Sequence, residues 1–310
     1  MPRLSNPSPK NLVKRKPVAV GEWFSSFCSA LRINAELRSS IGYRTGRIAK
    51  QLNSDFRNLD SDTANRFYVG SFGRNTAIPS VSDLDVLYEL PYSVYAKFNS
   101  YIGNKQSALL SAVRASLKNT YVSSDIAGDG QVCVIEFTDH IKYEILPAFV
   151  NTEGGYTFGD SNGGGSWKSC KPKQEMNEFF KRNTECKGNL LELGRMVRAW
   201  RDQNSVPMNG MLIDTLAYQF IGMWQYRDKS YLYYDYLTRD FFQFLAGQKV
   251  DQAYWLAPGS GSYVVRRGPF EYKARQAELR ALEAIAYQNS GHEWSAKQKY
   301  REIYGISFPA

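Results

Sequence analysis

Two short stretches decide the fold, FYVGSFGRNT at residues 67–76 and SDLDV at residues 82–86. The first predicts a strand that ends in a Gly-Ser turn and continues into a short helical connection, and the second predicts another strand. Because side chains alternate along a strand, Asp83 and Asp85 share one face while Leu84 enters the core. Two carboxylates held so close repel each other unless a cation lies between them, so the pair predicts a magnesium site.

The turn before these aspartates supplies groups that suit a chain of phosphates. The turn at Gly70 and Ser71 offers backbone N–H groups, and Ser71 adds a hydroxyl beside the predicted cation. Groups of this kind cradle anionic oxygens. Arg74, next to the turn, is a further candidate ligand for the same phosphates. The turn and the aspartates together predict a site for nucleotide transfer.

A β-hairpin is predicted at residues 132–137 and 141–149. Its second strand places Glu144 among apolar neighbours, before Pro147, where we expect the strand to stop. A carboxylate in such surroundings is costly unless it is paired or binds a metal. Glu144 would complete a set of three carboxylates for two Mg²⁺ ions about 3.5–4 Å apart, the arrangement that drives in-line phosphoryl displacement. Mn²⁺ is the alternative ion.

These motifs resemble the nucleotidyltransferase core of the polymerase-β superfamily. More narrowly, they resemble the cGAS/DncV-like nucleotidyltransferases (CD-NTases), which have the oligoadenylate synthases as eukaryotic relatives. The resemblance covers about residue 20 to the end of the chain. The segments that carry it are Gly70-Ser71, Asp83-x-Asp85, EILPAF at 144–149, LGRMVRAW at 193–200 and YGISFP at 304–309.

The resemblance implies an enzyme that joins NTPs and closes a cyclic di- or trinucleotide, a second messenger in bacterial anti-phage (CBASS) signalling. It implies that Asp83 and Asp85 bind both metal ions and that Glu144 binds the ion nearer the acceptor hydroxyl. Gly70 and Ser71 would hold the β- and γ-phosphates. Pyrophosphate would leave after the hydroxyl attacks the α-phosphorus.

Two arginines of the segment at 193–200 are candidates for binding the donor triphosphate. Arg195 and Arg198 lie three residues apart, so a helix would present both on one face toward one triphosphate. The alternative is an ordinary solvated face, since Arg201 also lies near that surface. The similarity of this segment to the family's basic helix favours the phosphate role.

Two positions depart from the family pattern. Where the family commonly has a serine and an aromatic residue after the basic helix, this chain has Gly210 and Met211. The third carboxylate is Glu144, where oligoadenylate synthases have aspartate. A tyrosine cluster between residues 226 and 236 could stack a base instead, although a place in the core is the interpretation that we favour.

We predict a bilobal α/β (α+β) fold with a polymerase-β-like core and a mixed sheet. The expected divisions are a basic disordered tail at residues 1–20, a catalytic lobe with an N-terminal helix at 21–180, and a helical lobe at 181–310. Five basic residues and no acidic residue occur before Glu22, so five of the nine net positive charges belong to the tail. A solvated tail is favoured over a nucleic-acid-binding arm.

Several further elements follow from local patterns. Residues 21–57 predict helix with a break near Gly42, and residues 104–119 predict a second helix. The glycines of residues 151–167 lack the spacing of a Walker loop and predict a flexible crossover between the lobes. Alanines at 274, 277, 281 and 284 form a small-residue stripe that allows close helix packing.

The composition narrows the class of protein. Hydrophobic residues make up 43% of the chain, which supports a packed core. No apolar run approaches the ~20 residues needed to cross a bilayer, and the N-terminus lacks the apolar segment of a secretory signal. Four cysteines without CxxC spacing and two histidines make a zinc site unexpected and fit a reducing cytoplasm.

The predicted partners are NTP substrates (ATP, GTP or pyrimidine NTPs) and a downstream effector that the cyclic nucleotide activates. Whether an activating partner protein is required stays open, and we expect neither a membrane nor a stable nucleic-acid partner. Two alternatives remain. One is a transferase of the same fold that modifies RNA, a protein or a small molecule. The other is a catalytically silent nucleic-acid-binding module, against which the three carboxylates argue.

Overall fold

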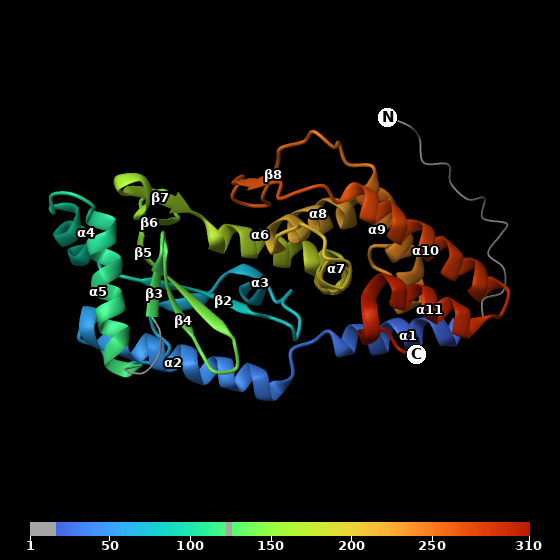
Figure 1. Cartoon of the computed structure of the whole chain (residues 1–310), viewed down its shortest axis with the longest axis horizontal. Coiled ribbons are helices and arrows are strands. Elements are labelled where there is room, and N and C mark those ends of the chain that lie inside the picture. The colour runs from blue at the N-terminus through green and yellow to red at the C-terminus, as the bar shows by residue number, and fades with distance from the viewer. Residues whose placement is uncertain (1–16, 122–125) are drawn as a thin grey trace.

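The computed structural model describes residues 17–121 and 126–310 and has two lobes, a helix-covered sheet and a bundle of helices (Figure 1). The predicted bilobal α/β architecture is confirmed. The sheet lobe consists of α2 (Ala35–Arg57), β1 (Arg66–Tyr68), α3 (Gly70–Gly73), β2 (Asp83–Glu89), α4 (Tyr92–Asn99), α5 (Lys105–Thr120), β3 (Ile126–Asp129), β4 (Val132–Glu136), β5 (Lys142–Val150), β6 (Tyr156–Asp160), η2 (Asn162–Gly164) and β7 (Ser166–Cys170).

The second lobe is mostly helical. In Figure 1, α6 runs from the sheet toward the other helices. The remaining elements are α1 (Pro17–Ala30), α6 (Pro172–Glu185), α7 (Asn189–Asn204), α8 (Gly210–Met223), η3 (Tyr231–Tyr233), α9 (Tyr234–Ala246), β8 (Tyr254–Leu256), β9 (Tyr263–Val265), α10 (Glu271–Asn289), α11 (Glu293–Tyr304) and η4 (Gly305–Ser307). None of the described helices is long and apolar enough to span a membrane.

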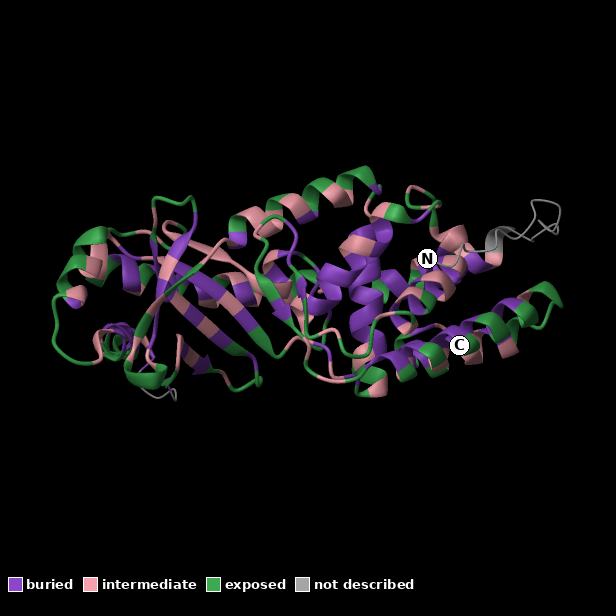
Figure 2. Ribbon diagram, turned by 90° about the horizontal axis from the view of Figure 1, so that it is seen from above, coloured by how far each residue is buried: buried purple, intermediate pink, exposed green. Residues whose placement is uncertain are grey.

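The sheet has the order β1-β2-β5-β4-β3, with β6 and β7 added beyond β5. Strands β2 and β5 are parallel and the other pairs are antiparallel. Helices α2 and α5 cover one face, where their apolar side chains form a common core with alternate residues of β2 and β5, among them Leu84, Tyr88, Tyr143 and Ile145. Figure 2 shows buried segments along the strands of the sheet and in the helices of the other lobe. On the opposite face of β2, Asp83 and Asp85 lie toward the other lobe, whereas Leu87 is buried in a smaller core with Tyr156 and Phe158 of the sheet lobe.

Helix α1 belongs to the helical lobe, although the sequence placed it in the catalytic lobe. Phe24 and Phe27 are fully buried in the same core as Tyr300 and Phe308 at the end of the chain. The helix also begins at Pro17, so residues 17–20 are helical and not part of a disordered tail. The rest of the predicted tail, residues 1–16, lies outside the described residues.

The predicted hairpin of β4 and β5 and the helix at 104–119 are confirmed. The helical break lies at residues 31–34, not near Gly42, because Asn34 caps α2 by accepting a hydrogen bond from the backbone N–H of Leu37. Strand β5 continues through Pro147, which lies where β6 replaces β4 as its antiparallel partner. A proline is tolerated at such a change of partner because one ladder hydrogen bond can be given up there.

The glycine-rich segment is not a flexible crossover. Residues 156–170 form the antiparallel pair β6–β7, and the glycines at 163–165 make the turn between the strands with positive φ angles. The alanine stripe of α10 is buried as predicted, and α10 packs against both α9 and α11. Within the lobe expected to be wholly helical, β8 and β9 form a small hairpin.

Candidate active site

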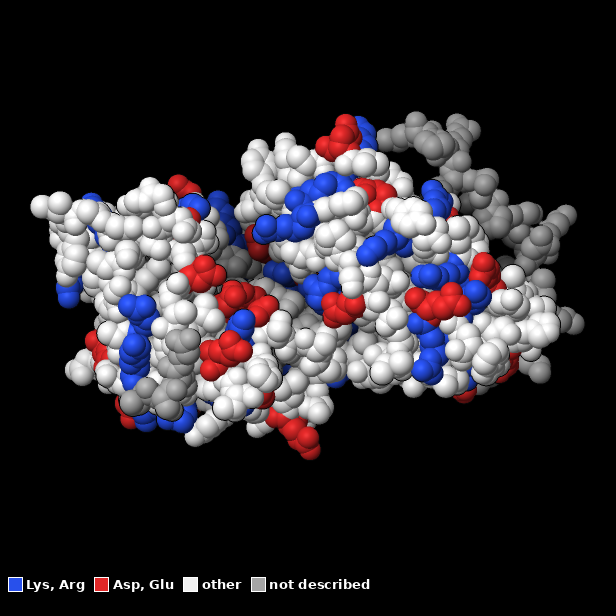
Figure 3. Space-filling model, in the orientation of Figure 1, with Lys and Arg blue, Asp and Glu red and all other residues white. Residues whose placement is uncertain are grey.

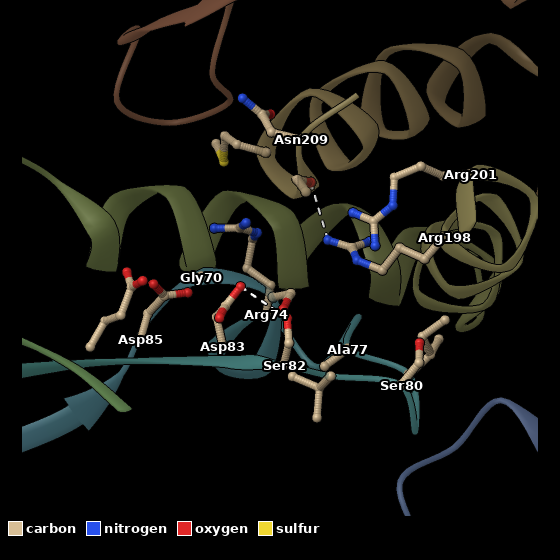
Figure 4. A pocket seen from close by; sticks show the side chains of 16 residues that line it. Gly70, Arg74, Ala77, Ser80, Ser82, Asp83, Asp85, Arg198, Arg201 and Asn209 are labelled. Atoms are coloured by element: carbon tan, nitrogen blue, oxygen red, sulfur yellow. Dashed lines mark hydrogen bonds between the residues drawn. The ribbon is translucent and has the colours of Figure 1, made fainter. Parts of the chain in front are cut away.

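Residues from both lobes line one pocket with a volume of about 350 Å³ (Figure 4). It lies where β2, β5 and α3 of the sheet lobe face α7 and α8. Figure 3 shows acidic side chains on the sheet lobe beside the hollow between the lobes, and basic side chains across from them. All the predicted site residues except Arg195 line the pocket: Gly70, Ser71, Arg74, Asp83, Asp85, Glu144 and Arg198.

Three of these residues, Asp83, Asp85 and Glu144, are called the pocket carboxylates below. Asp83 and Asp85 leave one face of β2 as predicted, because Leu84 between them is fully buried on the other face. The parallel register places Asp85 directly beside Glu144 of β5. The sheet therefore brings together carboxylates that are 59 positions apart in the sequence, 85 to 144.

The Gly-Ser turn packs directly against the second aspartate. Gly70 has a φ of +59°, and a Cβ atom on it would lie 1.8 Å from Oδ2 of Asp85. The turn is fixed to the strand by a 2.9 Å hydrogen bond from the backbone N–H of Val69 to the carbonyl oxygen of Asp85. Only glycine combines this backbone conformation with so close an approach, so the turn and the carboxylate form one unit.

The pocket carboxylates carry negative charge that the protein only partly compensates. Burial raises the pKa of Asp85, and Asp83 raises it further, while Arg74 opposes the shift. Burial also raises the pKa of Glu144, with added repulsion from Asp85 and Asp83. Mutual repulsion of this kind is relieved by a bound cation.

In this conformation the three pocket carboxylates are not close enough together to coordinate one metal ion. Within residues 17–121 and 126–310, no three carboxylate, imidazole or thiol groups are near enough together to hold a metal ion. The hydroxyl of Ser82 donates a 3.0 Å hydrogen bond to Oδ2 of Asp83 (Figure 4). A metal site at Asp83, Asp85 and Glu144 stays a prediction.

Arg198 lines the pocket, but its guanidinium is already engaged. Its Nη1 and Nη2 atoms donate to Oδ1 and Oδ2 of Asp214 at 2.7 and 2.9 Å. The same two atoms donate to the carbonyl oxygens of Gly194 and Gly210 at 3.0 and 3.1 Å. Arg74 donates from Nε to Oδ2 of Asp214 at 2.8 Å. Sequence reasoning missed Asp214, which is fully buried.

Arg195 does not enter the pocket. It donates 2.7 and 3.1 Å hydrogen bonds to the carbonyl oxygen of Asn75 and to Oε2 of Glu192, which also pairs with Arg32. The face of α7 that bears Arg195 and Arg198 is buried, so the alternative of a solvated face is wrong. A triphosphate role for Arg195 stays a prediction, and its observed contacts join α7 to the loop after α3.

Other residues of the lining were missed from the sequence. Arg201 lines the pocket beside Arg198 (Figure 4), and its spacing of three residues was the available signal. Gly210 and Met211, where the family pattern is broken, line it too. The tyrosines at 226–236 do not line it. They pack against one another and the helical core, which confirms the core interpretation.

Residues 18–183, over half of the chain, match the model of the Second Messenger Oligonucleotide or Dinucleotide Synthetase (SMODS) domain. The chain belongs to this family. It is therefore a CD-NTase, a nucleotidyltransferase of the cyclic nucleotide synthase family. The resemblance inferred from the sequence motifs is confirmed.

Known relatives agree with this assignment. A probable cyclic nucleotide synthase of Bacillus cereus (strain VD146) is 20% identical over 302 residues, which cover 78% of this chain and 81% of that protein. CdnC of E. coli MS115-1, solved in a complex with HORMA-deltaN, superposes with a TM-score of 0.66 at 13% identity, covering 94% of this chain and 99% of that chain. GTP-bound DncV of Vibrio cholerae gives a TM-score of 0.65 at 14% identity, covering 94% and 96%. These structural likenesses show the fold.

Proposed function

We propose that this CD-NTase makes a cyclic di- or trinucleotide from NTPs with two Mg²⁺ ions, or Mn²⁺ in their place. One observation carries the proposal. Asp85 lies beside Glu144 in the sheet and against Gly70 of the turn, so acidic ligands and a phosphate-binding turn share one pocket. A triphosphate held at the turn would have its phosphates next to the acidic face of β2.

The chemistry of the pocket carboxylates fits magnesium. Carboxylate oxygens are the hard ligands that Mg²⁺ prefers. The raised pKa values of Asp85 and Glu144 come first from burial and then from repulsion by neighbouring carboxylates, and a bound divalent cation would offset both. Asp83, Asp85 and Glu144 would hold the ions. Two ions bound there would stabilise charge on the attacking and leaving oxygens of an in-line displacement.

The residues of the chain then have separate tasks. Ser71 and the backbone at Gly70 bind the β- and γ-phosphates, and Arg74 adds positive charge on the same side. The ribose hydroxyl of the acceptor attacks the α-phosphorus. The bond between the α-phosphorus and the oxygen that bridges to the β-phosphate breaks, and pyrophosphate leaves. The proton of the hydroxyl passes to Glu144, beside Asp85.

We infer a wider role from the resemblance to bacterial CD-NTases. A cyclic nucleotide released by this enzyme would act as a second messenger on an effector in CBASS anti-phage defence, in the cytoplasm, where four free cysteines would stay reduced. The structural relative CdnC was solved with a HORMA protein, which motivates a search for an activating partner. ATP, GTP and pyrimidine NTPs are all candidate substrates.

The test is incubation of the protein with all four NTPs and Mg²⁺, followed by mass spectrometry of the phosphatase-resistant products. A cyclic product supports the proposal, whereas a linear or macromolecule-bound product favours another transferase reaction. Asp83→Asn should lower pyrophosphate release more than about 100-fold, because changes even in outer-shell residues of metal sites cost about 10–100-fold. Asp60→Asn, at an exposed ion pair with Lys50, is the matched control and should keep full activity. Unchanged pyrophosphate release by Asp83→Asn would refute the assignment.

A further inference from the structure

Asp214 joins the two lobes at the wall of the pocket. It accepts hydrogen bonds from Arg198 of its own lobe and from two residues that follow the Gly-Ser turn, Arg74 at 2.8 Å and Thr76 at 3.1 Å. These four residues are called the Asp214 cluster below. Asp214 is fully buried and does not line the pocket, so it can affect a bound nucleotide only through a neighbour or through its charge.

The two arginines of the Asp214 cluster differ in what they have left to offer a ligand. Both terminal nitrogens of Arg198 donate to Asp214 and to the backbone carbonyls of Gly194 and Gly210. Arg74 uses only Nε for Asp214, and its Nη1 and Nη2 atoms make no hydrogen bond to any described residue. An arginine has five N–H donors. Arg74 therefore keeps four of them on the pocket wall.

The position of Arg74 suits an anion that bridges the turn and the carboxylates. Its side chain is about 6% exposed, its charge acts on Asp85, and it follows the turn directly. Figure 4 shows its guanidinium between the pocket carboxylates and Arg198. Nε is the only nitrogen of the Arg74 guanidinium that a side chain among the described residues holds. The orientation of its two Nη groups therefore depends on the group that binds Nε.

We propose that Asp214 is a positioning residue, which directs the two Nη groups of Arg74 toward the triphosphate. Arg198 holds Asp214 in place through two hydrogen bonds. This inference rests on the proposed nucleotide site. It assigns the phosphate contact to Arg74 and makes Arg198 part of the support. Gly194 permits the arrangement, because a Cβ atom there would lie 3.0 Å from Cγ2 of Thr76 and 3.2 Å from Oδ1 of Asp214.

The proposal and simple electrostatics predict opposite changes in nucleotide affinity for the substitution Asp214→Asn. Asp214→Asn removes a negative charge near the pocket, which by electrostatics alone would tighten the binding of a polyanion. If Asp214 positions Arg74, the same substitution weakens binding instead. Arg74→Ala removes the phosphate contact and should weaken binding about tenfold or more, the scale of a lost charge-assisted hydrogen bond.

A double-mutant cycle tests the proposal, with Kd for a non-hydrolysable ATP analogue and Mg²⁺ measured by calorimetry. Asp214→Asn should raise Kd about tenfold, and the double variant Asp214→Asn/Arg74→Ala should bind no more weakly than Arg74→Ala alone. Thr76→Val, which removes one donor to Asp214, should show a smaller effect that also disappears without Arg74. It serves as the test if Asp214→Asn does not fold. Glu271→Gln, which changes a buried carboxylate paired with Arg266 at 2.7 Å outside the pocket lining, should leave Kd unchanged.

Unchanged or tighter binding by Asp214→Asn, or additive losses in the double variant, would overturn the proposal. The cycle also separates this inference from the proposed function. A wild-type protein that binds the analogue but releases no pyrophosphate from NTPs would refute synthase activity of the protein alone, while the cycle would still decide the role of Asp214. A wild-type protein that binds no analogue would overturn both.

Discussion

The pocket carboxylates and Asp214 are acidic side chains where the two lobes meet, and their surroundings are opposite. The pocket carboxylates come from β2 and β5, and no basic side chain pairs with them directly among the described residues. Asp214 comes from α8 and receives four hydrogen bonds, three of them from guanidinium groups. Burial disfavours the charge of Asp85, Glu144 and Asp214 alike, so the difference between them lies in their neighbours.

The pKa shifts follow that difference. Burial and repulsion raise the pKa values of Asp85 and Glu144. Burial would also raise the pKa of Asp214, but Arg198 and Arg74 outweigh it and the net shift is downward. A carboxylate that already has counter-charges stabilises the fold, whereas one without them is available to a ligand. Stability should follow this division between carboxylates with and without counter-charges.

The largest effect is expected at Asp214. Asp214→Ala leaves Arg74 and Arg198 as buried charges without their anion, which costs about 3–5 kcal/mol of unfolding free energy. Denaturant unfolding measures the loss. Asp60→Ala, which breaks the exposed ion pair with Lys50, should change stability by less than about 1 kcal/mol. Equal losses in the two variants would mean that burial of the cluster does not matter.

Gly70→Ala should cause the second-largest loss of stability. A side chain at a φ of +59° costs about 1–3 kcal/mol, and at Gly70 its Cβ atom would also collide with the carboxylate of Asp85. Gly163→Ala is a matched control, because Gly163 has the same φ of +59° and no atom within 4 Å of its added Cβ. Gly70→Ala should therefore lose more stability than the control, and should lose NTP turnover where the control keeps it. Equal behaviour would show that the turn tolerates displacement from Asp85.

Much of this comparison could be read from local sequence patterns. The alternation in SDLDV predicted that Asp83 and Asp85 share a face, and an acidic residue in an apolar strand identified Glu144. The same argument applies to Asp214, the one charged residue in the apolar segment GMLIDTLAYQFIGM of α8. The signal was present, but its partners were not recognisable, since Arg74 and Asp214 are joined only when the two lobes pack.

The errors have a common physical cause. The glycines at 163–165 looked like a linker because glycine serves both flexible chains and tight turns, and only the pairing of β6 with β7 distinguishes them. Helix α1 precedes the sheet lobe in sequence, yet Phe24 and Phe27 pack on the end of the chain. Arg195 and Arg198 share a helix face as predicted, but tertiary packing buries that face. Local patterns predict elements and leave their distant partners undetermined.

Asp85→Asn should have a smaller effect on stability, with the opposite sign to that of Asp214→Ala. Without divalent ions it removes one of the repelling charges beside Glu144 and should stabilise the protein by about 1 kcal/mol. Added Mg²⁺ should raise the melting temperature of the wild type and not that of the variant. Thermal unfolding with chelator and with Mg²⁺ measures both effects. A destabilised variant would mean that Asp85 has a counter-charge in solution.

The smallest expected effect is a pH dependence that Glu144 confers. Its pKa is raised above the ordinary value of 4.5, so the folded state holds this proton more tightly than the unfolded state does. The resulting stability is present below pH 4.5 and is lost as the pH rises through the raised pKa. In chelator, the melting temperature of Glu144→Gln minus that of the wild type should therefore increase between about pH 4 and pH 7, and Mg²⁺ should reduce that increase. Asp214 behaves in the opposite way, because a lowered pKa withdraws stability only as the pH falls below its ordinary 3.8. A flat or falling difference for Glu144→Gln would place Glu144 with the compensated carboxylates and remove the distinction between the two groups.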